Sequence, residues 1–201
     1  MSKTHLITSS HELWQPSCNM IEARYRDCYG AAISITAKEM VVVTKDGHTP
    51  IAAGGVRCET DGFFSDSYLC GGIVPHLSKQ AGMAITQSDL IEVVTLSSIK
   101  SGAFFPLIDA VISLGRERGK TWGVFTATSQ IRSIMQRAGI PFVDLGAALP
   151  QRISNPQAWG RYYETSPRVC ALYDYNASLK FNPRQEVANL GSHEVQNASG
   201  F

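Results

Sequence analysis

One acidic residue, Glu92, interrupts an otherwise apolar and β-branched run that extends over residues 90–96. A carboxylate inside such a segment is costly unless it is protonated, paired or hydrogen-bonded. Burial would raise its pKa toward the range in which a carboxylate accepts a proton from an amine. Glu92 is therefore our candidate general base. The alternative is a structural ion pair with an arginine such as Arg24 or Arg57.

A short polar turn, residues 97–102, follows this run and leads into a helical pattern. Free backbone N–H groups and the helix dipole attract anions at a helix N-terminus. Ser101, Gly102 and Ala103 are thus candidates for holding a phosphate group. The turn contains a single glycine, so it matches neither a P-loop nor a dinucleotide-binding fingerprint. An ordinary polar turn before a helix is the alternative.

Aromatic side chains cluster near the C-terminal end, at Trp159, Tyr162 and Tyr163. They are candidates for the wall of an acceptor or acyl pocket, and either tyrosine is a candidate general acid. Packing against a sheet edge is the alternative. Arg24 and Arg26 are candidates for binding an acceptor carboxylate, with a solvated helix face as the alternative.

Cys70 and His76 form a rival set, because a thiol beside a histidine base is the nucleophile of cysteine hydrolases. The five cysteines contain no C-x-x-C pair, and the five histidines show no ligand spacing. The sequence therefore predicts neither a disulfide framework nor a metal site. Reduced thiols favour a cytoplasmic location.

The composition is that of an ordinary globular protein, with 201 residues and a net charge of +1. This charge gives no electrostatic reason to expect nucleic acid or an anionic membrane as partner. The apolar runs are far shorter than the roughly 20 residues needed to span a bilayer, and residues 1–20 lack the apolar core of a secretory signal. We expect one domain over residues 1–175, with residues 1–17 loosely ordered, and a polar tail over residues 176–201.

The hydrophobic pattern alternates between strand and helix periods along the chain. Strands are predicted at 40–44, 50–57, 62–69, 90–96, 121–127, 142–145 and 168–173, and helices at 19–29, 104–114 and 129–138, with a loop or broken helix at 70–89. An Asp46-Gly47 turn joins the first two strands as a hairpin. The strand, helix and strand of residues 90–127 favour a parallel pair with a right-handed crossover. We therefore predict an α/β fold with a mixed central sheet flanked by helices.

This order of elements resembles that of GNAT-type acyltransferases. The resemblance implies that the strand bearing Glu92 and the next parallel strand splay apart. In that fold the pantetheine arm of a thioester donor lies in the gap, and its pyrophosphate lies on the turn that precedes the helix.

A closer resemblance is to the thermostable hemolysin family, over about residues 21–174. The matching segments are 91–96, 121–128, Arg132 with 138–139, 150–153, 159–163, 24–25, 29–31 and 68–69. The chain departs from this family at Val94-Thr95, where the family usually has Gly-Asn. It departs from the general GNAT turn, Gly-x-Gly or Gly-x-Ala, at Phe104. This family in turn is similar to acyl-homoserine-lactone synthases, which move an acyl chain from a carrier-protein or coenzyme A thioester to an amine.

The resemblance implies transfer of an acyl group from acyl-CoA, or from the pantetheine of an acyl carrier protein, to a small amine by direct attack. Residues expected at the donor are Val93, Val94, Thr95, Ser101, Gly102, Ala103 and Thr126; those expected at the acceptor are Arg24 and Trp159; and those expected in catalysis are Glu92, Tyr162 and Tyr163. Two alternatives stay open. One is a non-catalytic GNAT-like module that binds an acyl carrier or a pathway protein. The other is a lytic protein, although no basic amphipathic helix is present.

Overall fold

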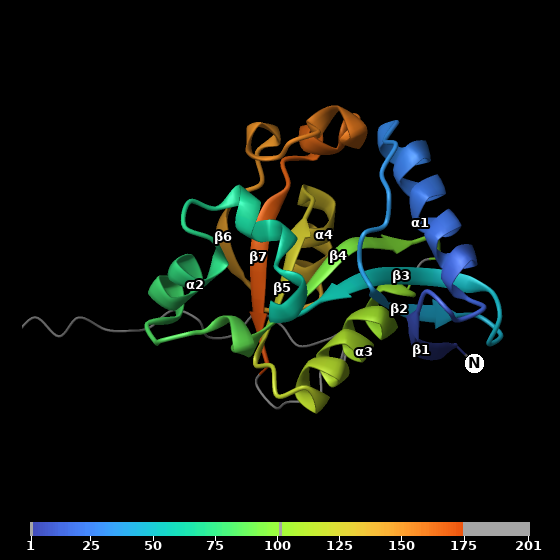
Figure 1. The fold of residues 1–201 in the computed structure, drawn as a ribbon, viewed down its shortest axis with the longest axis horizontal. Helices are drawn as coiled ribbons and strands as arrows, with labels where there is room; N and C mark the ends of the chain where they lie inside the picture. The colour runs from blue at the N-terminus through green and yellow to red at the C-terminus, as the bar shows by residue number, and fades with distance from the viewer. Residues whose placement is uncertain (1, 101, 175–201) are drawn as a thin grey trace, which may run out of the picture.

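A computed structural model describes residues 2–100 and 102–174, and within them seven strands form one mixed sheet (Figure 1). The spatial order is β1-β2-β3-β4-β5-β7-β6. The strands are β1 (Lys3–Thr8), β2 (Glu39–Thr44), β3 (Pro50–Arg57), β4 (Leu90–Ser98), β5 (Trp122–Ala127), β6 (Val143–Ala147) and β7 (Arg168–Tyr173). The predicted tail, residues 176–201, lies outside the described residues.

The strands β4 and β5 run parallel, whereas the other neighbouring strands run antiparallel. Their pairing begins at Leu90 with Trp122 and stops at Val93 with Phe125. Beyond that point β4 continues along β3 as far as Ser98, and β5 continues along β7. The two strands therefore splay apart at their carboxyl ends, as predicted.

Four helices cover the sheet in the described part of the chain: α1 (Trp14–Tyr29), α2 (Ile73–Ala81), α3 (Phe104–Glu117) and α4 (Ser129–Arg137). Helix α3 packs against Ile91 and Val93 of β4. The alternate residues of β4 point to the opposite face, where Leu90 packs in a cluster with α2. Helix α1 also covers this second face, over β2 and β3. Glu92 therefore projects toward the side of the sheet that carries α1 and α2.

The expectation that residues 1–17 are loosely ordered is wrong. Residues Lys3–Thr8 form β1, which pairs antiparallel with β2, and α1 begins at Trp14. Only Ile7 of this strand is buried, so its hydrophobic pattern is too weak to detect. Its partner lies more than 30 residues further along the chain, and local sequence carries no trace of that pairing.

The strand predicted at residues 62–69 is also wrong. Two short 3₁₀ helices follow β3, Glu59–Asp61 and Phe64–Tyr68, and the second occupies most of this range. The carboxylate of Asp66 accepts a hydrogen bond of 2.7 Å from the backbone N–H of Ile73. Polar side chains that bond to nearby backbone groups favour turns over a sheet ladder. The other predicted strands and helices are confirmed, with bounds that differ most at α1, which begins five residues before the predicted start at Asn19. Helix α2 lies within the predicted loop or broken helix.

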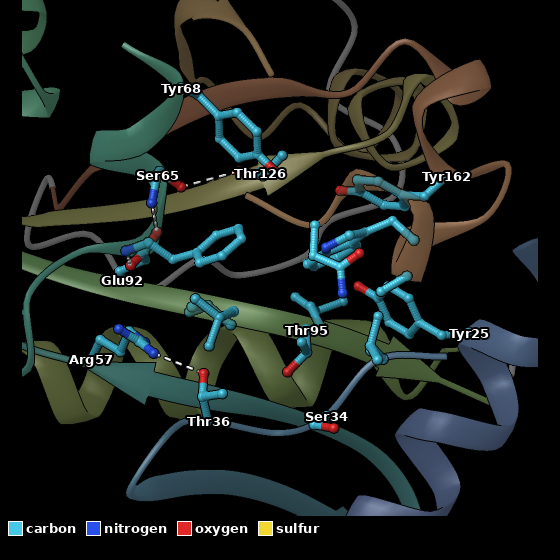
Figure 2. Close-up of a pocket in the computed structure, with 18 of the residues that line it drawn as sticks. Tyr25, Ser34, Thr36, Arg57, Ser65, Tyr68, Glu92, Thr95, Thr126 and Tyr162 are labelled. Atoms are coloured by element: carbon cyan, nitrogen blue, oxygen red, sulfur yellow. Dashed lines mark hydrogen bonds between the residues drawn. The ribbon is translucent and has the colours of Figure 1, made fainter. Parts of the chain in front are cut away.

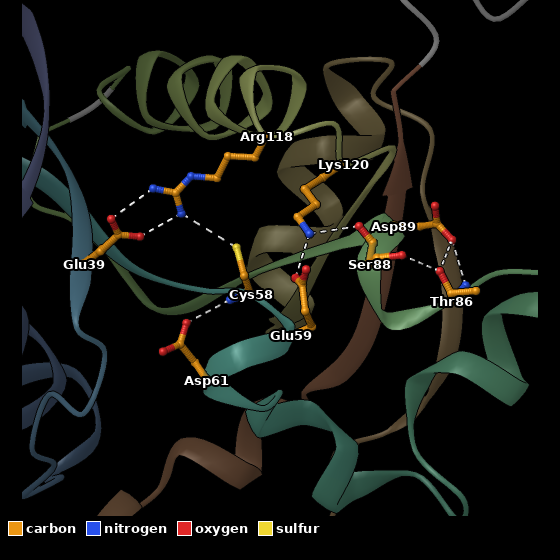
Figure 3. A network of polar contacts seen from close by, with 9 residues as sticks. All are labelled: Glu39, Cys58, Glu59, Asp61, Thr86, Ser88, Asp89, Arg118 and Lys120. Atoms are coloured by element: carbon orange, nitrogen blue, oxygen red, sulfur yellow. Dashed lines mark hydrogen bonds and ion pairs between the residues drawn. The ribbon is translucent and has the colours of Figure 1, made fainter.

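A network of polar contacts fixes the first of these 3₁₀ helices (Figure 3). The Lys120 ammonium donates to Oε2 of Glu59 at 2.6 Å and to the carbonyl oxygen of Ser88 at 2.9 Å. Beside it, the Arg118 guanidinium makes two hydrogen bonds to the Glu39 carboxylate, at 2.7 and 2.9 Å. The segment that leads into Phe64 is thereby tied to the sheet.

Candidate active site

A cavity of about 290 Å³ lies where β4 and β5 diverge, on the face of the sheet that carries α1 (Figure 2). Its walls come from α1, the connecting segment 32–36, the end of β3, the 3₁₀ helix Phe64–Tyr68, β4, β5 and the segment 155–162. Beyond Val93 and Phe125 the two strands no longer pair by hydrogen bonds. Residues of both β4 and β5 therefore face the space between them. The cavity therefore gathers residues from most of the chain around one gap in the sheet.

Glu92 is fully buried and faces this cavity. Its Oε2 atom accepts a hydrogen bond of 2.6 Å from the backbone N–H of Phe64, and Oε1 accepts one of 2.8 Å from that of Ser65. Burial raises the pKa of Glu92 to about 7, although hydrogen bonds from Ser65 and Phe64 and the charge of Arg57 oppose the rise. In the described part of the chain neither Arg24 nor Arg57 forms an ion pair with Glu92. A carboxyl group with this pKa exchanges protons near neutral pH.

The strand β4 contains a bulge three residues after Glu92. Gly55 pairs with Val94 and Ala53 pairs with Ser97, so β4 has one more residue than β3 over this stretch. Thr95 takes a left-handed conformation with φ of 50°, which is strained for a β-branched residue. Its Oγ1 atom is buried without a hydrogen-bond partner in the described residues, and Thr95 lines the cavity. Strain of this kind concentrates at functional sites.

A glycine on the neighbouring strand makes room for the bulge. A Cβ atom at Gly54 would lie 2.9 Å from Cγ1 of Val93, which is closer than van der Waals contact permits. The small residues of β3 therefore accommodate the irregular backbone of β4.

A hydroxyl pair spans the two sides of the gap next to Glu92. The Oγ atom of Ser65 lies 3.0 Å from Oγ1 of Thr126, on β5 (Figure 2). Because Ser65 also donates its backbone N–H to Glu92, this bond links the carboxylate to the opposite strand. Thr126 lines the cavity together with Val93, Val94 and Thr95, and binding of the donor by these four residues stays a prediction.

Aromatic rings form the far wall of the cavity. The Tyr25 and Tyr162 rings stack with centroids 6.0 Å apart, and Trp159 lies 5.2 Å from Tyr162 and 5.7 Å from Phe64. Burial raises the pKa of Tyr25 and Tyr162, so both phenols stay protonated. Figure 2 shows the hydroxyl groups of both tyrosines directed toward the cavity. Trp159 and Tyr162 both line the cavity, and their roles toward an acceptor or acyl chain stay predictions.

Gly160 locks this aromatic segment against α1. Its φ is 52°, and a Cβ atom there would lie 2.2 Å from the carbonyl oxygen of Tyr29. The backbone N–H of Arg161 donates to that same oxygen at 2.8 Å. A larger residue at position 160 would clash with the backbone at the end of α1, so one of the two segments would have to move.

Other predicted site residues lie elsewhere. Tyr163 does not line the cavity, but its hydroxyl lies 2.8 Å from that of Tyr68, which does. Arg24 is exposed on α1 and does not line the cavity. Gly102 and Ala103 directly precede α3, and Ala103 is buried against the opposite face of the sheet. Ser101 lies outside the described residues.

The Phe104 ring, expected in the phosphate turn, is buried in a cluster with Ile108, Met135 and Leu172. The rival pair of Cys70 and His76 is not assembled. Nδ1 of His76 bonds to the carbonyl oxygen of Gly72 at 2.9 Å, and Cys70 is exposed.

Sequence reasoning missed several groups that the cavity brings together. They are the backbone N–H groups of Phe64 and Ser65, the side chains of Tyr25 and Tyr68, and Arg57 as a cavity residue. Nearly every residue type has a backbone N–H group, so residue types do not show which of these groups faces the cavity. The register of the predicted hairpin with β4 would have placed Arg57 beside Glu92, but that register spans 35 positions of sequence.

In the residues that the structure describes, no group of three or more His, Cys, Asp and Glu side chains is arranged to hold a metal ion. No described helix is both long and apolar enough to cross a membrane.

Solved structures share this fold. The acyl-homoserine-lactone synthase LasI matches with a TM-score of 0.60 and 10% identity, over 86% of this chain and 90% of LasI. FeeM, an N-acyl amino acid synthase from uncultured soil microbes, matches with a TM-score of 0.57 and 14% identity, over 86% and 92% of the two chains. BjaI, a CoA-dependent acyl-homoserine-lactone synthase solved with SAM and isopentyl-CoA, matches with a TM-score of 0.56 and 10% identity, over 86% and 83%.

The predicted GNAT-like α/β fold with its splayed strand pair is therefore confirmed. No curated protein matches the chain in sequence. A family model named thermostable hemolysin matches residues 7–177. Because that match covers most of the sequence, this chain belongs to the thermostable hemolysin family.

Proposed function

We propose that this protein is an N-acyltransferase that moves an acyl group from a pantetheine thioester to a small amine. The observation that carries the proposal is Glu92, a buried carboxylate that faces a cavity at the splayed strand pair. The amine nitrogen attacks the thioester carbonyl carbon, the C–N bond forms and the C–S bond breaks. An amide and a free thiol result, and no metal takes part.

Glu92 is the proton acceptor in this scheme. An ammonium group is not a nucleophile, so a proton must leave the amine before or during the attack. Burial raises the pKa of Glu92 to about 7, which suits a general base at neutral pH. The two backbone N–H donors hold its carboxylate in place without neutralising it by a fixed cation.

Thr95 is the donor that we assign to the thioester carbonyl oxygen, which gains negative charge during the attack. Thr95 lines the cavity and its buried hydroxyl has no hydrogen-bond partner among the described residues, so donating to the carbonyl oxygen costs no hydrogen bond seen there. The bulge also frees a backbone N–H from the β3–β4 ladder beside it. Donors that are fixed before the reaction stabilise such a developing charge most effectively.

Tyr162 is the proton donor that we assign to the departing thiolate. Its phenol stays protonated because burial raises its pKa, and it faces the cavity from the aromatic wall. Tyr163 contributes indirectly, since its hydroxyl bonds to that of the cavity residue Tyr68. We therefore treat Tyr163 as a positioning residue.

The thioester donor enters through the gap between β4 and β5 in this proposal. Val93, Val94 and Thr126 border its pantetheine arm, and the start of α3 at Ala103 receives its phosphate groups. Acyl-CoA is the simpler donor because BjaI, which shares the fold, is CoA-dependent. The Phe104 ring packs into the protein interior and does not project from the start of α3 toward a pyrophosphate. An acyl carrier protein is the second possible donor.

The proposed reaction is tested by incubating the purified protein with acyl-CoA of several chain lengths and a panel of small amines. Release of free thiol and the mass of the acylated amine report turnover. Glu92→Gln serves as the matched control. If the protein binds the thioester but forms no product with any amine, it is a non-catalytic acyl-binding module. If it causes neutral liposomes to leak, the lytic function is favoured. All five cysteines are free, which fits the reducing cytoplasm where acyl-CoA is made.

A further inference from the structure

The Arg57 guanidinium lies at the polar end of the cavity, with part of its hydrogen-bonding capacity unused (Figure 2). One terminal nitrogen donates to Oγ1 of Thr36 at 2.8 Å. The other donates to the carbonyl oxygens of Gly62 at 3.2 Å and Asp61 at 3.5 Å. Its Nε atom is buried and has no hydrogen-bond partner in the described residues. Its protein partners are thus neutral oxygen atoms.

The nearby carboxylates form their hydrogen bonds and ion pairs with other groups. Asp61 pairs with the Lys38 ammonium at 2.8 Å. Glu92 accepts hydrogen bonds from the backbone of Phe64 and Ser65. Within residues 2–100 and 102–174, no carboxylate lies within ion-pair distance of Arg57. A partly buried guanidinium that forms no direct ion pair in these residues gains from a ligand that brings an anion within hydrogen-bonding distance, although the more distant charges of Asp61 and Glu92 already act on it.

Arg57 and Glu92 are direct cross-strand partners in the register of β3 and β4. Side chains at such positions share one face of the sheet and have Cβ atoms about 5 Å apart. A ligand with an amine at Glu92 and an anion at Arg57 must therefore carry the two groups close together. An α-amino acid carries its amino group and its carboxylate on the same carbon atom. A diamine or a simple alkylamine has no anionic group that could bind Arg57.

We propose that the acceptor is an α-amino acid whose carboxylate is bound by Arg57 while its amino group faces Glu92. The inference rests on the proposed acyl transfer and adds the class of its acceptor. The planar guanidinium matches a carboxylate through parallel hydrogen bonds, and its five N–H donors are not all used by the protein. Tyr25 and Trp159 then lie on the aromatic side of the cavity, where the apolar parts of the substrates bind.

The test compares each acceptor with the same molecule lacking its negative charge. L-Leucine and L-phenylalanine are measured against leucinamide and phenylalaninamide by calorimetry, with and without coenzyme A. The native protein should bind the acids about 10- to 100-fold more tightly than the amides, as expected for charge-assisted hydrogen bonds. Arg57→Gln should abolish that preference and Arg57→Lys should restore part of it. Arg137→Gln, at an exposed arginine that ends α4 away from the cavity, should leave it unchanged.

The ratio of acid to amide affinity is taken within each variant, so a partial loss of folded protein does not alter it. Equal binding of acids and amides by the native protein, no binding of either acid, or a preference that survives Arg57→Gln would overturn the proposal. The same four molecules are then offered with octanoyl-CoA. Amino acids that bind at Arg57 but form no acyl product would refute acyl transfer and leave the anion site standing. If the amino acids and their amides are acylated at equal rates, the anion site is refuted and acyl transfer is retained.

Discussion

The backbone N–H of Ser65 donates a hydrogen bond of 2.8 Å to the Glu92 carboxylate, although the two residues are 27 positions apart in the chain. Ser65 belongs to the short 3₁₀ helix Phe64–Tyr68, which contacts β5. A neutral backbone donor fixes the carboxylate while adding no full positive charge beside it. Burial raises the pKa of the carboxyl group to about 7, although the hydrogen bonds from Ser65 and Phe64 and the charge of Arg57 lower it in part.

Replacement of Glu92 by glutamine should reduce turnover about 10²- to 10⁴-fold, because general-base help is typically of that size. Donor binding should stay intact. The native rate should fall as the pH drops through about 7, since the pKa of Glu92 is raised to about 7 and only the ionised form accepts a proton. This acidic limb should be absent from the residual rate of the variant. Full turnover in Glu92→Gln would show that the base lies elsewhere.

Glu92 should also make the stability of the protein depend on pH. Burial raises the pKa of Glu92 from 4.5 to about 7, so between these values the folded state holds a proton that the unfolded state has lost. The free energy of unfolding should therefore decrease as the pH rises from about 4.5 to 7, by roughly 3 kcal/mol in all. Chemical denaturation at several pH values measures this slope, and Glu92→Gln should flatten it. An unchanged slope in the variant would assign the effect to another group.

Thr95→Gly should separate stability from activity. Relief of the left-handed conformation gains roughly 1–2 kcal/mol, and the greater freedom of the unfolded chain offsets about 0.5–1 kcal/mol of it. The variant should thus be slightly more stable by denaturation and yet turn over more slowly, because it lacks the hydroxyl at the cavity. Thr95→Ser keeps the hydroxyl and is the matched control. A glycine variant with native turnover would leave Thr95 without a role in the reaction.

The two adjacent tyrosines should respond differently to removal of their hydroxyl groups. Tyr163→Phe breaks the bond to Tyr68 and should lower stability by about 1 kcal/mol. The Tyr162 hydroxyl makes no hydrogen bond in the described residues, so Tyr162→Phe should slow turnover with little change in melting temperature. Thermal unfolding and kinetics on the same preparations measure both effects. Native turnover in Tyr162→Phe would assign that ring to packing.

A thioester donor at 100 times its dissociation constant should stabilise the protein by about 2.7 kcal/mol. Acyl-CoA and acyl carrier protein are compared by thermal unfolding, with free coenzyme A as the control for binding without an acyl chain. Backbone amides of residues 97–103 should exchange hydrogen more slowly when the donor is bound, because its phosphates contact the start of α3. A donor that neither stabilises the protein nor protects these amides would contradict the assigned donor site.

Local patterns in the sequence were sufficient to predict the central unit of the fold. The run around Glu92 and the helical spacing of residues 104–114 follow from side chains that repeat every two residues in a strand and every three or four in a helix. The same run pointed to Glu92, because a charge among apolar residues is unusual wherever it is buried. Trp159 and Tyr162 also emerged from their residue types and from the family resemblance.

Only the tertiary structure decided which groups surround Glu92. The strand β1, the 3₁₀ helix that carries Ser65 and the position of Arg57 depend on contacts between segments that are tens of residues apart. Arg24 and Arg57 look equivalent in a sequence, because the neighbouring residues do not show whether either side chain faces solvent or the cavity. Sheet register and the packing of loops place one on an exposed helix and the other in the cavity. Those choices are made by burial and hydrogen bonding summed over the whole chain, which no short stretch of sequence contains.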